Sequence, residues 1–276
     1  KTTMNKKEIV AIGSHGQTVW HISQGANRTS IQMGDPNIIA EQTGITTVAD
    51  FRRRDIAAGG QGAPLVPAFH AAYFRAANEN RVILNIGGIA NITVLPCNRD
   101  QPVRGFDTGP GNTLLDMWAN EQQRGRFDQD GGFAQQGTVL ADVLAKLMAD
   151  PYFALAPPKS TGREYFNRHW LEKTVGSLSR YPAADIQATL SELTAHTIRD
   201  TIREQAATTQ RILVCGGGIH NHHLIQRLQA LLPVITIEST AVYGIDPQWV
   251  EAIAFAWLAK QTIENRPGNL PSVTGA

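Results

Sequence analysis

Residues 82–95 constrain the fold most, because two apolar runs there flank the pair Gly87-Gly88. Apolar runs of this length around a glycine pair predict a β-hairpin, since tight hairpin turns need the positive φ angles that glycine adopts readily. A third strand is expected to end near Phe106, and a glycine-rich turn then leads into a helix over residues 112–120. The sheet of this protein is therefore predicted to contain an antiparallel pair.

Helical and strand patterns alternate along the rest of the chain. Residues 50–64 are rich in glycine and are expected to form a connector. Asp246-Pro247 predicts the start of a last helix that ends near Glu264. The remaining elements are predicted strands at residues 9–12, 45–48, 212–215 and 234–237, and predicted helices at 138–148 (capped by Thr138), 185–204 and 224–232. This succession predicts an α/β fold with a mixed sheet.

The composition excludes several classes of partner. Of 276 residues, 42% are hydrophobic and 18% are charged, and the formal net charge is +1. This balance argues against disorder and against binding to nucleic acid or to a membrane surface. The two cysteines form neither a disulfide framework nor a zinc motif. Residues 1–8 lack the apolar region of a signal peptide, and no apolar run approaches the roughly 20 residues of a membrane span, so a cytoplasmic protein is expected.

Three glycine-rich turns follow apolar strands and predict a site for nucleotide phosphates. Glycine lets backbone N–H groups approach an anion closely, and a helix N-terminus favours negative charge. The alternative is that these glycines only end strands. Neither the GxxxxGK[ST] phosphate loop nor a GxGxxG motif is present, which argues against a P-loop or dinucleotide-binding fold. The turns are Gly87-Gly88, residues 105–112 with Gly109 among them, and Gly216-Gly217-Gly218.

Two carboxylates are candidate functional groups. Asp107 stands between glycines at a strand end before a helix, where it can serve as a base or water-positioning group in phosphoryl transfer; alternatively, it only caps the turn. Glu251 is the only charge in residues 250–259 and is predicted to lie beyond the first turn of a buried helix, so it needs a partner or a ligand. The alternative for Glu251 is an ordinary salt bridge or an exposed stripe of the helix.

Two other segments carry polar chemistry. His15 and His21 bracket a polar stretch that contains Trp20, which could line a sugar site; a core histidine and a surface histidine are the alternative. Residues 159–162, Lys-Ser-Thr-Gly, are similar to the KTG motif of penicillin-binding enzymes. Because the chain has no SxxK motif, that chemistry is excluded.

Blocks spread in order over nearly the whole chain resemble the anhydro-N-acetylmuramic acid kinase family. The resemblance implies an α/β, actin/hexokinase-like (ribonuclease H-like) ATPase fold of two lobes. It also implies that ATP and water open 1,6-anhydro-N-acetylmuramic acid, a product of peptidoglycan recycling, to give N-acetylmuramic acid 6-phosphate and ADP. The matching blocks are residues 12–21, 50–56, 59–65, 84–91, 105–112, 159–166, 214–218, 251–257 and 267–274.

The same resemblance implies roles for individual residues. Asp107 matches the base that activates water, and Glu251 matches the carboxylate that contacts the sugar. His15 is a candidate sugar contact, and Arg54 and Arg163 are candidates for holding the lactyl carboxylate. ATP with Mg²⁺ is the implied cofactor, and a homodimer is the implied assembly. Gly87-Gly88 matches the second phosphate loop, joined by Gly109, and Gly216, Gly217 and Gly218 match the loop on the adenosine side.

The chain departs from the family pattern at its start. The family begins with a strand, a phosphate turn and a return strand, whereas residues 12–15 follow here within a dozen positions and no such turn precedes them. We expect an incomplete N-terminal lobe in residues 1–55 and a C-terminal ATPase lobe in residues 56–276. Two alternatives follow: a truncated ATPase-fold module that binds sugar or nucleotide without catalysis, and a sugar kinase that acts on an ordinary hydroxyl.

Overall fold

The computed structural model describes residues 5–22, 25 and 28–276. Residues 1–4, on which the predicted absence of a signal peptide partly rests, lie outside the described residues. The chain forms two compact units. The first unit comprises Lys1–Arg75, Asp100–Arg104 and Trp249–Ala276, and the second comprises Ala76–Arg99 and Gly105–Gln248. A lobe division after residue 55 stays a prediction. Within the described part of the chain, no helix combines the length and apolar character needed to cross a bilayer.

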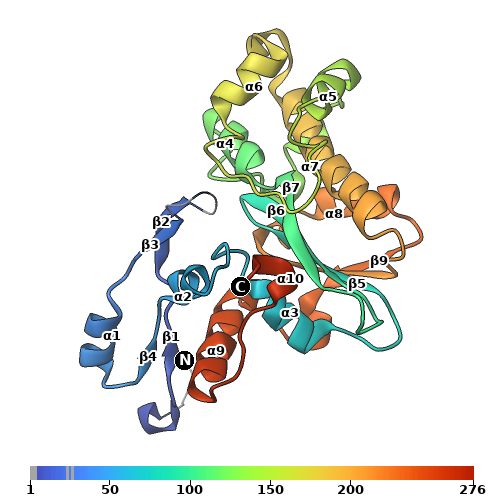
Figure 1. The fold of residues 1–276 in the computed structure, drawn as a ribbon. Coiled ribbons are helices and arrows are strands. Elements are labelled where there is room, and N and C mark those ends of the chain that lie inside the picture. The colour runs from blue at the N-terminus through green and yellow to red at the C-terminus, as the bar shows by residue number, and fades with distance from the viewer. Residues whose placement is uncertain (1–4, 23–24, 26–27) are drawn as a thin grey trace. The chain divides into compact units, whose positions relative to one another are not determined.

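A five-stranded sheet forms the centre of the second unit (Figure 1). Its strands are β5 (Arg81–Ile86), β6 (Ile89–Leu95), β7 (Arg104–Pro110), β8 (Arg211–Cys215) and β9 (Thr236–Ser239), in the order β7-β6-β5-β8-β9. β5 pairs antiparallel with β6, from Arg81 opposite Leu95 to Ile86 opposite Ala90, which confirms the predicted hairpin. β8 is parallel to both β5 and β9.

This topology confirms the expected fold class. Counted in chain order, the strands lie 3-2-1-4-5 across the sheet, and the second strand runs against the first. A mixed sheet of this order with helices packed on it is the ribonuclease H-like arrangement. Long connections separate the parallel strands, as parallel pairing requires. The carboxyl ends of β5 and β8 therefore meet at one edge of the sheet, where Asn85 lies opposite Cys215.

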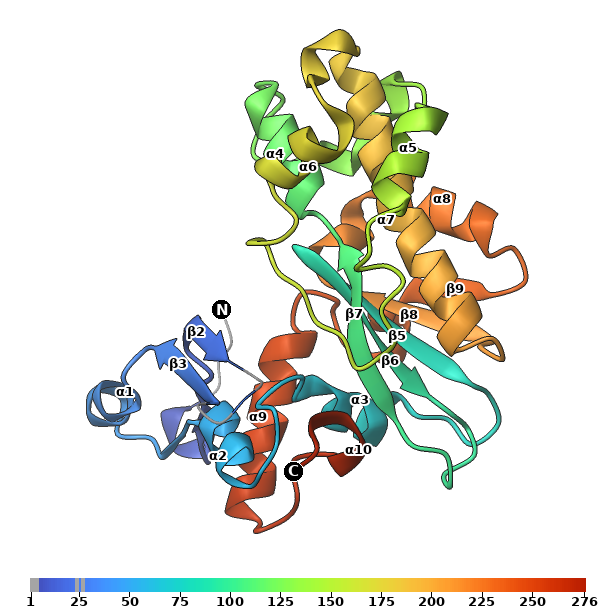
Figure 2. The ribbon, with the colours of Figure 1, turned by 45° about the horizontal axis from the view of Figure 1, so that its top comes forward.

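Helices α7 (Ala183–Gln205) and α8 (His222–Leu231) cover one face of this sheet, as Figures 1 and 2 show. Alternate residues of β5 face them because side chains in a strand alternate between faces with a period of two. Thus Val82, Leu84 and Ile86 pack with Ile198 and Ile202 of α7 in one buried cluster. A second core joins the start of α7 to α4 (Thr113–Glu121), α5 (Ala141–Met148) and α6 (Arg168–Val175).

The first unit contains smaller elements. Asp55 fixes its glycine-rich turn: Oδ2 accepts a hydrogen bond from Gly62 N–H (2.8 Å), and Oδ1 accepts one from the Thr274 hydroxyl (2.8 Å). Leu65, Phe255 and Leu258 form a small apolar cluster. The elements are β1 (Ile12–Gly13) paired with β4 (Thr47–Val48), β2 (Gln17–Ile22) paired with β3 (Thr29–Met33), and helices α1 (Pro36–Thr43), α2 (Phe51–Ala57), α3 (Val66–Phe74), α9 (Val250–Ile263) and α10 (Pro271–Thr274).

Several local predictions were wrong. Residues 9–11 do not form a strand: β1 begins at Ile12, and Ile9 and Val10 are exposed. The third strand ends at Pro110 rather than near Phe106, so Asp107 lies within β7 and not at its end. The expected connector at residues 50–64 begins with helix α2, because no glycine occurs before residue 59. The helix expected from Asp246 is α9, which begins at Val250 and is followed by α10. Asp246 accepts from Gln248 N–H (2.8 Å) and the Pro247 carbonyl accepts from Gly216 N–H (2.9 Å), which holds this stretch in a turn. Thr138 does not cap α5, whose N-cap is Leu140.

Candidate functional site

Two of the three glycine-rich turns are hydrogen-bonded to each other in the second unit. The Gly87 carbonyl accepts from Asn112 N–H (2.8 Å), and the Gly88 carbonyl accepts from Gly111 N–H (2.9 Å) and Thr113 N–H (3.0 Å). The hairpin turn thus caps the start of α4, so these N–H groups are already partnered. Neither Gly87 nor Gly88 has a positive φ, so that reason for the glycine pair was wrong.

The third turn packs against the end of β5. Gly216 has φ +80°, and a Cβ there would lie 2.4 Å from Asn85 Oδ1; at Gly218 it would lie 2.2 Å from the Ile86 side chain. A Cβ at Gly217 would make only an ordinary contact, with the Asn112 amide nitrogen at 4.0 Å. Because Asn112 also donates to the Ile86 carbonyl (3.2 Å), all three turns meet at one edge of the sheet.

Gly109 has a packing role inside β7. Its φ is +151°, and an added Cβ would lie 2.8 Å from the Phe153 ring. Both the backbone conformation and the close approach of the ring therefore require glycine at this position.

Asp107 lies in β7, two residues before Gly109, and is held from several sides. Its Oδ2 accepts a hydrogen bond from Thr161 N–H (3.0 Å). Its backbone N–H donates to the Lys159 carbonyl (3.1 Å), and its backbone carbonyl accepts from the Tyr152 hydroxyl (3.1 Å). Burial raises the pKa of Asp107 from 3.8 to about 6, against the opposing effect of the Thr161 N–H. A fixed carboxylate with this pKa can take a proton near neutral pH.

Residues 159–163 form the segment that holds Asp107. Lys159 Nζ donates to the carbonyls of Phe153 (3.1 Å) and Tyr152 (3.3 Å) and lies 4.8 Å from the centre of the Tyr152 ring. The Thr161 hydroxyl is buried and has no hydrogen-bond partner among the described residues. At the other end, a Cβ added to Gly88 would lie 3.0 Å from the guanidinium of Arg163. One short segment therefore touches both the carboxylate and the hairpin turn.

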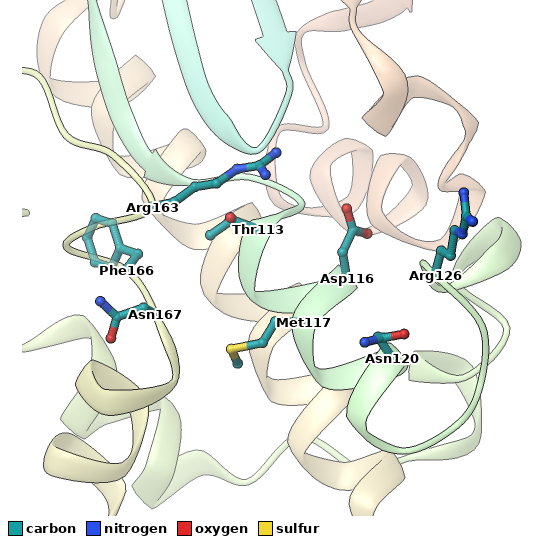
Figure 3. A pocket seen from close by; sticks show the side chains of 8 residues that line it. All are labelled: Thr113, Asp116, Met117, Asn120, Arg126, Arg163, Phe166 and Asn167. Carbon is teal, nitrogen blue, oxygen red and sulfur yellow. The ribbon is translucent and has the colours of Figure 1, made fainter. Parts of the chain in front are cut away.

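A pocket of about 450 Å³ opens along α4 in the same unit (Figure 3). The Asp116 carboxylate lies between the side chains of Arg163 and Arg126 in this view. Burial raises the pKa of Asp116 to about 6; Arg163 opposes this rise and Asp128 adds to it. The lining residues are Thr113, Asp116, Met117, Asn120, Arg126, Arg163, Phe166 and Asn167.

A second polar cluster lies in the first unit. Arg52 Nε donates to His15 Nε2 (2.7 Å), and Arg52 also donates to the Gly62 carbonyl (3.0 Å). Because a guanidinium only donates, His15 Nε2 must accept, so the ring proton is on Nδ1, 2.7 Å from the Gly16 carbonyl. Burial lowers the pKa of His15, and the positive charge of Arg52 lowers it further. The negative charge of Glu251 opposes that shift.

The other predicted residues of this unit are placed differently. His21 Nδ1 lies 3.0 Å from the Ser30 hydroxyl. The Arg54 guanidinium makes no hydrogen bond or ion pair with any described residue. Arg52, two residues earlier in α2, is the arginine that binds His15. Glu251 is exposed and lies in the first turn of α9, so the buried position expected beyond that turn was wrong, and the helix dipole favours a carboxylate there.

Sequence reasoning missed three residues of these clusters. Arg52 was one of three adjacent arginines with nothing to distinguish it, and Asp116 lay in an ordinary amphipathic helix. Thr161 stood in a segment that matched the family, but nothing in the sequence gave it a contact with Asp107. Among the described residues, no three His, Cys, Asp or Glu side chains gather as a metal cluster.

A ribonuclease H-like sheet with glycine-rich turns at one edge and a carboxylate in the edge strand β7 defines the actin/hexokinase-like ATPase fold. The family model described as anhydro-N-acetylmuramic acid kinase matches residues 1–276. The chain belongs to this family and is a phosphotransferase.

Relatives with the same name match the whole length of the chain. The protein from Coxiella burnetii is 53% identical over 276 residues, which are 100% of this chain and 74% of the relative. The protein from Xylella fastidiosa is 54% identical over 276 residues and is covered to 72%. Among solved structures, a ligand-bound xylulose kinase from Lactobacillus acidophilus gives a TM-score of 0.48 at 12% identity, covering 85% of this chain and 49% of that one.

Proposed function

We propose that this chain, in the cytoplasm, converts 1,6-anhydro-N-acetylmuramic acid, ATP and water into N-acetylmuramic acid 6-phosphate and ADP during peptidoglycan recycling. The observation that supports this most is Asp107: a half-buried carboxylate with a pKa of about 6, one oxygen fixed by Thr161 N–H, in the strand that leads to the glycine-rich turns. Hydrolytic ring opening needs such a base, because water must lose a proton as it attacks.

The proposed reaction balances with one base. Asp107 takes a proton from water, whose oxygen forms a bond to C1 of the sugar. The C1–O6 bond breaks, and its electron pair stays on O6. O6 then forms a bond to the γ-phosphorus of ATP, and the bond from that phosphorus to the β-phosphate oxygen breaks to release ADP. The proton on Asp107 passes to solvent after turnover. Strain in the bicyclic sugar favours the opening step.

The turns and the pocket in the second unit suit ATP. Glycines at residues 87–88 and 217 let phosphate oxygens come close to the backbone. In the adjoining pocket, the side chains of Asp116 and Asn120 make no hydrogen bond with the described residues, and they can bind ribose hydroxyls and a base edge. Met117 offers apolar surface to the base; Phe166 also lines the pocket but is almost fully buried. Mg²⁺ would bind mainly to ATP oxygens and water, with one or two carboxylates as its protein ligands. It would neutralise phosphate charge.

The cluster in the first unit suits the sugar. Arg52 donates hydrogen bonds to His15 and Gly62. Glu251 is exposed, and its negative charge interacts electrostatically with Arg52. A carboxylate and a guanidinium can bind hydroxyl, amide and lactyl carboxylate groups of an acidic amino sugar. We therefore assign Glu251, His15 and Arg52 to sugar binding, with Arg54 as a secondary candidate. The homodimer stays a prediction.

A coupled ADP-release assay on the full chain tests the function. We expect turnover with the anhydro sugar and none with N-acetylmuramic acid, and Asp107→Asn should lower kcat by a factor of about 10² to 10⁴. The exposed Asp142→Asn is the matched control and should keep wild-type activity. Equal turnover of N-acetylmuramic acid would indicate a kinase for ordinary hydroxyls. Sugar binding by calorimetry without any turnover would indicate a binding module.

A further inference from the structure

The hydroxyl of Thr161 is buried without a hydrogen-bond partner among the described residues. A hydroxyl removed from water and left unpaired destabilises the folded protein, so such groups are uncommon and call for a reason. The described buried side-chain atoms in the same condition include Oγ of Ser191 and Oγ1 of Thr240. Of these three residues, Thr161 is the one that is hydrogen-bonded to the candidate base Asp107.

The position of this hydroxyl follows from the backbone. Thr161 N–H donates to Oδ2 of Asp107 at 3.0 Å, so the residue that carries the unpaired hydroxyl contacts the carboxylate directly. The segment cannot easily move away. Lys159 is anchored through its Nζ to the Phe153 carbonyl (3.1 Å), and its own carbonyl accepts from Asp107 N–H (3.1 Å). Two hydrogen bonds thus join Asp107 to the segment that carries the hydroxyl, one at its carboxylate and one at its backbone N–H.

We propose that the Thr161 hydroxyl binds the water molecule that Asp107 deprotonates. This inference rests on the proposed function and adds a residue to it. One hydrogen of the water points to Oδ1 of Asp107, the oxygen that Thr161 N–H leaves free, and the other is accepted by Oγ1 of Thr161. A lone pair of the water is then directed at C1. The proton moves to Oδ1, the C–O bond forms as C1–O6 breaks, and the hydroxyl of Thr161 is unchanged.

This arrangement accounts for both polar groups of Thr161. Its N–H orients the base and works against the rise in the base's pKa, while its hydroxyl would orient the nucleophile. A site that fixes base and water in one frame avoids the cost of ordering the water during the reaction. If the hydroxyl were only a by-product of packing the methyl group, its removal would not change the rate.

The test compares Thr161→Val with Thr161→Ser in the full chain. Valine keeps the shape and the backbone N–H but removes the hydroxyl, whereas serine keeps the hydroxyl. We expect Thr161→Val to lower kcat about 10- to 100-fold, the effect of one lost hydrogen bond to a reacting group, with little change in KM for the sugar. Thr161→Ser should recover kcat to within a few-fold. Thr240→Val, which removes another unpaired buried hydroxyl, should leave kcat unchanged.

Stability and the Asp107 variant separate the possible outcomes. Thr161→Val should melt at the same temperature as the wild type or higher, because an unpaired polar group is replaced by an apolar one. Wild-type kcat in Thr161→Val, with Asp107→Asn inactive, would overturn this inference alone. A lower melting temperature with parallel losses in Thr161→Val and Thr161→Ser would also overturn it, since the role would then be structural. An inactive wild type, or a fully active Asp107→Asn, would overturn the proposed function and this inference with it.

Discussion

Oδ2 of Asp107 accepts a hydrogen bond from the backbone N–H of Thr161 at 3.0 Å. The bond joins two segments that are far apart in the chain, the strand β7 and the residues that precede α6. It fixes one oxygen of the carboxylate, while burial keeps the pKa of that carboxylate at about 6. The Thr161 N–H therefore acts on both properties: it fixes the position of the carboxylate and opposes the larger effect of burial on its pKa.

The rate should depend on pH through Asp107. The carboxylate must be ionised to take a proton, so kcat/KM should fall tenfold per pH unit below about 6, the pKa given by burial. A pH–rate profile between pH 4.5 and 8.5, a range of about four units around that value, measures this. Asp116 also has a pKa near 6, so the acid limb should persist in Asp116→Asn. Loss of the limb in that variant would assign it to Asp116.

Replacement of Asp107 should stabilise the protein at neutral pH. The pKa of Asp107 is higher in the folded state (about 6) than its ordinary value of 3.8. Ionisation therefore opposes folding: the penalty is absent below pH 3.8, grows between 3.8 and 6, and is complete above 6. Asp107→Asn should gain up to about 3 kcal/mol at pH 8 and nothing near the lower pKa. Urea unfolding at both pH values measures this, and an equal gain at both would contradict it.

Asp116 should affect ATP binding more than chemistry. If the pocket along α4 holds the nucleoside, loss of the carboxylate removes one or two hydrogen bonds to ribose. Asp116→Asn should then raise KM for ATP by about tenfold and leave kcat for the saturated enzyme near wild type. Steady-state kinetics with ATP varied gives both values. An unchanged KM for ATP would show that the pocket has another use.

Replacement by alanine should destabilise the protein at Gly111 but not at Gly217. At Gly111 a Cβ would lie 2.4 Å from the Gly87 carbonyl oxygen, so Gly111→Ala must push the two turns apart and should cost about 1–3 kcal/mol. At Gly217 the Cβ would make only an ordinary contact with the Asn112 side chain at 4.0 Å, so Gly217→Ala should change the stability by less than about 0.5 kcal/mol. Thermal unfolding measures both. Gly217→Ala should still raise KM for ATP if phosphate approaches there, and an unchanged KM would argue against that approach.

Arg52, unlike Arg54, should affect the stability of the first unit and the pKa of His15. Arg52→Met removes the hydrogen bonds to His15 and Gly62, which should destabilise the unit by about 1–3 kcal/mol. The pKa of His15 should rise, because the positive charge that helps to lower it is gone. NMR titration of the His15 ring measures the pKa. Arg54→Met is the control and should leave both quantities at wild-type values; a similar shift there would mean that the effect is one of net charge.

Much of the second unit was predictable from sequence. The hairpin at residues 82–95 and the helix of Leu114, Leu115 and Trp118 were found because period and turn chemistry act over a few neighbouring residues. Boundaries at Asp246 and at residues 50–64 were predicted wrongly. In the first case a distant partner, Gly216, decided the backbone conformation, and no local pattern records such a bond.

By itself, the sequence determined the α/β class, the hairpin that makes the sheet mixed, the glycine-rich turns and Asp107 as a candidate base, because these depend on local periodicity and on motifs. Only the tertiary structure decided that Thr161 holds Asp107, that Arg163 packs on Gly88, and that Arg52 rather than Arg54 joins His15. Those pairings are long-range contacts between segments, and burial, which sets the pKa of Asp107, exists only once the segments have come together.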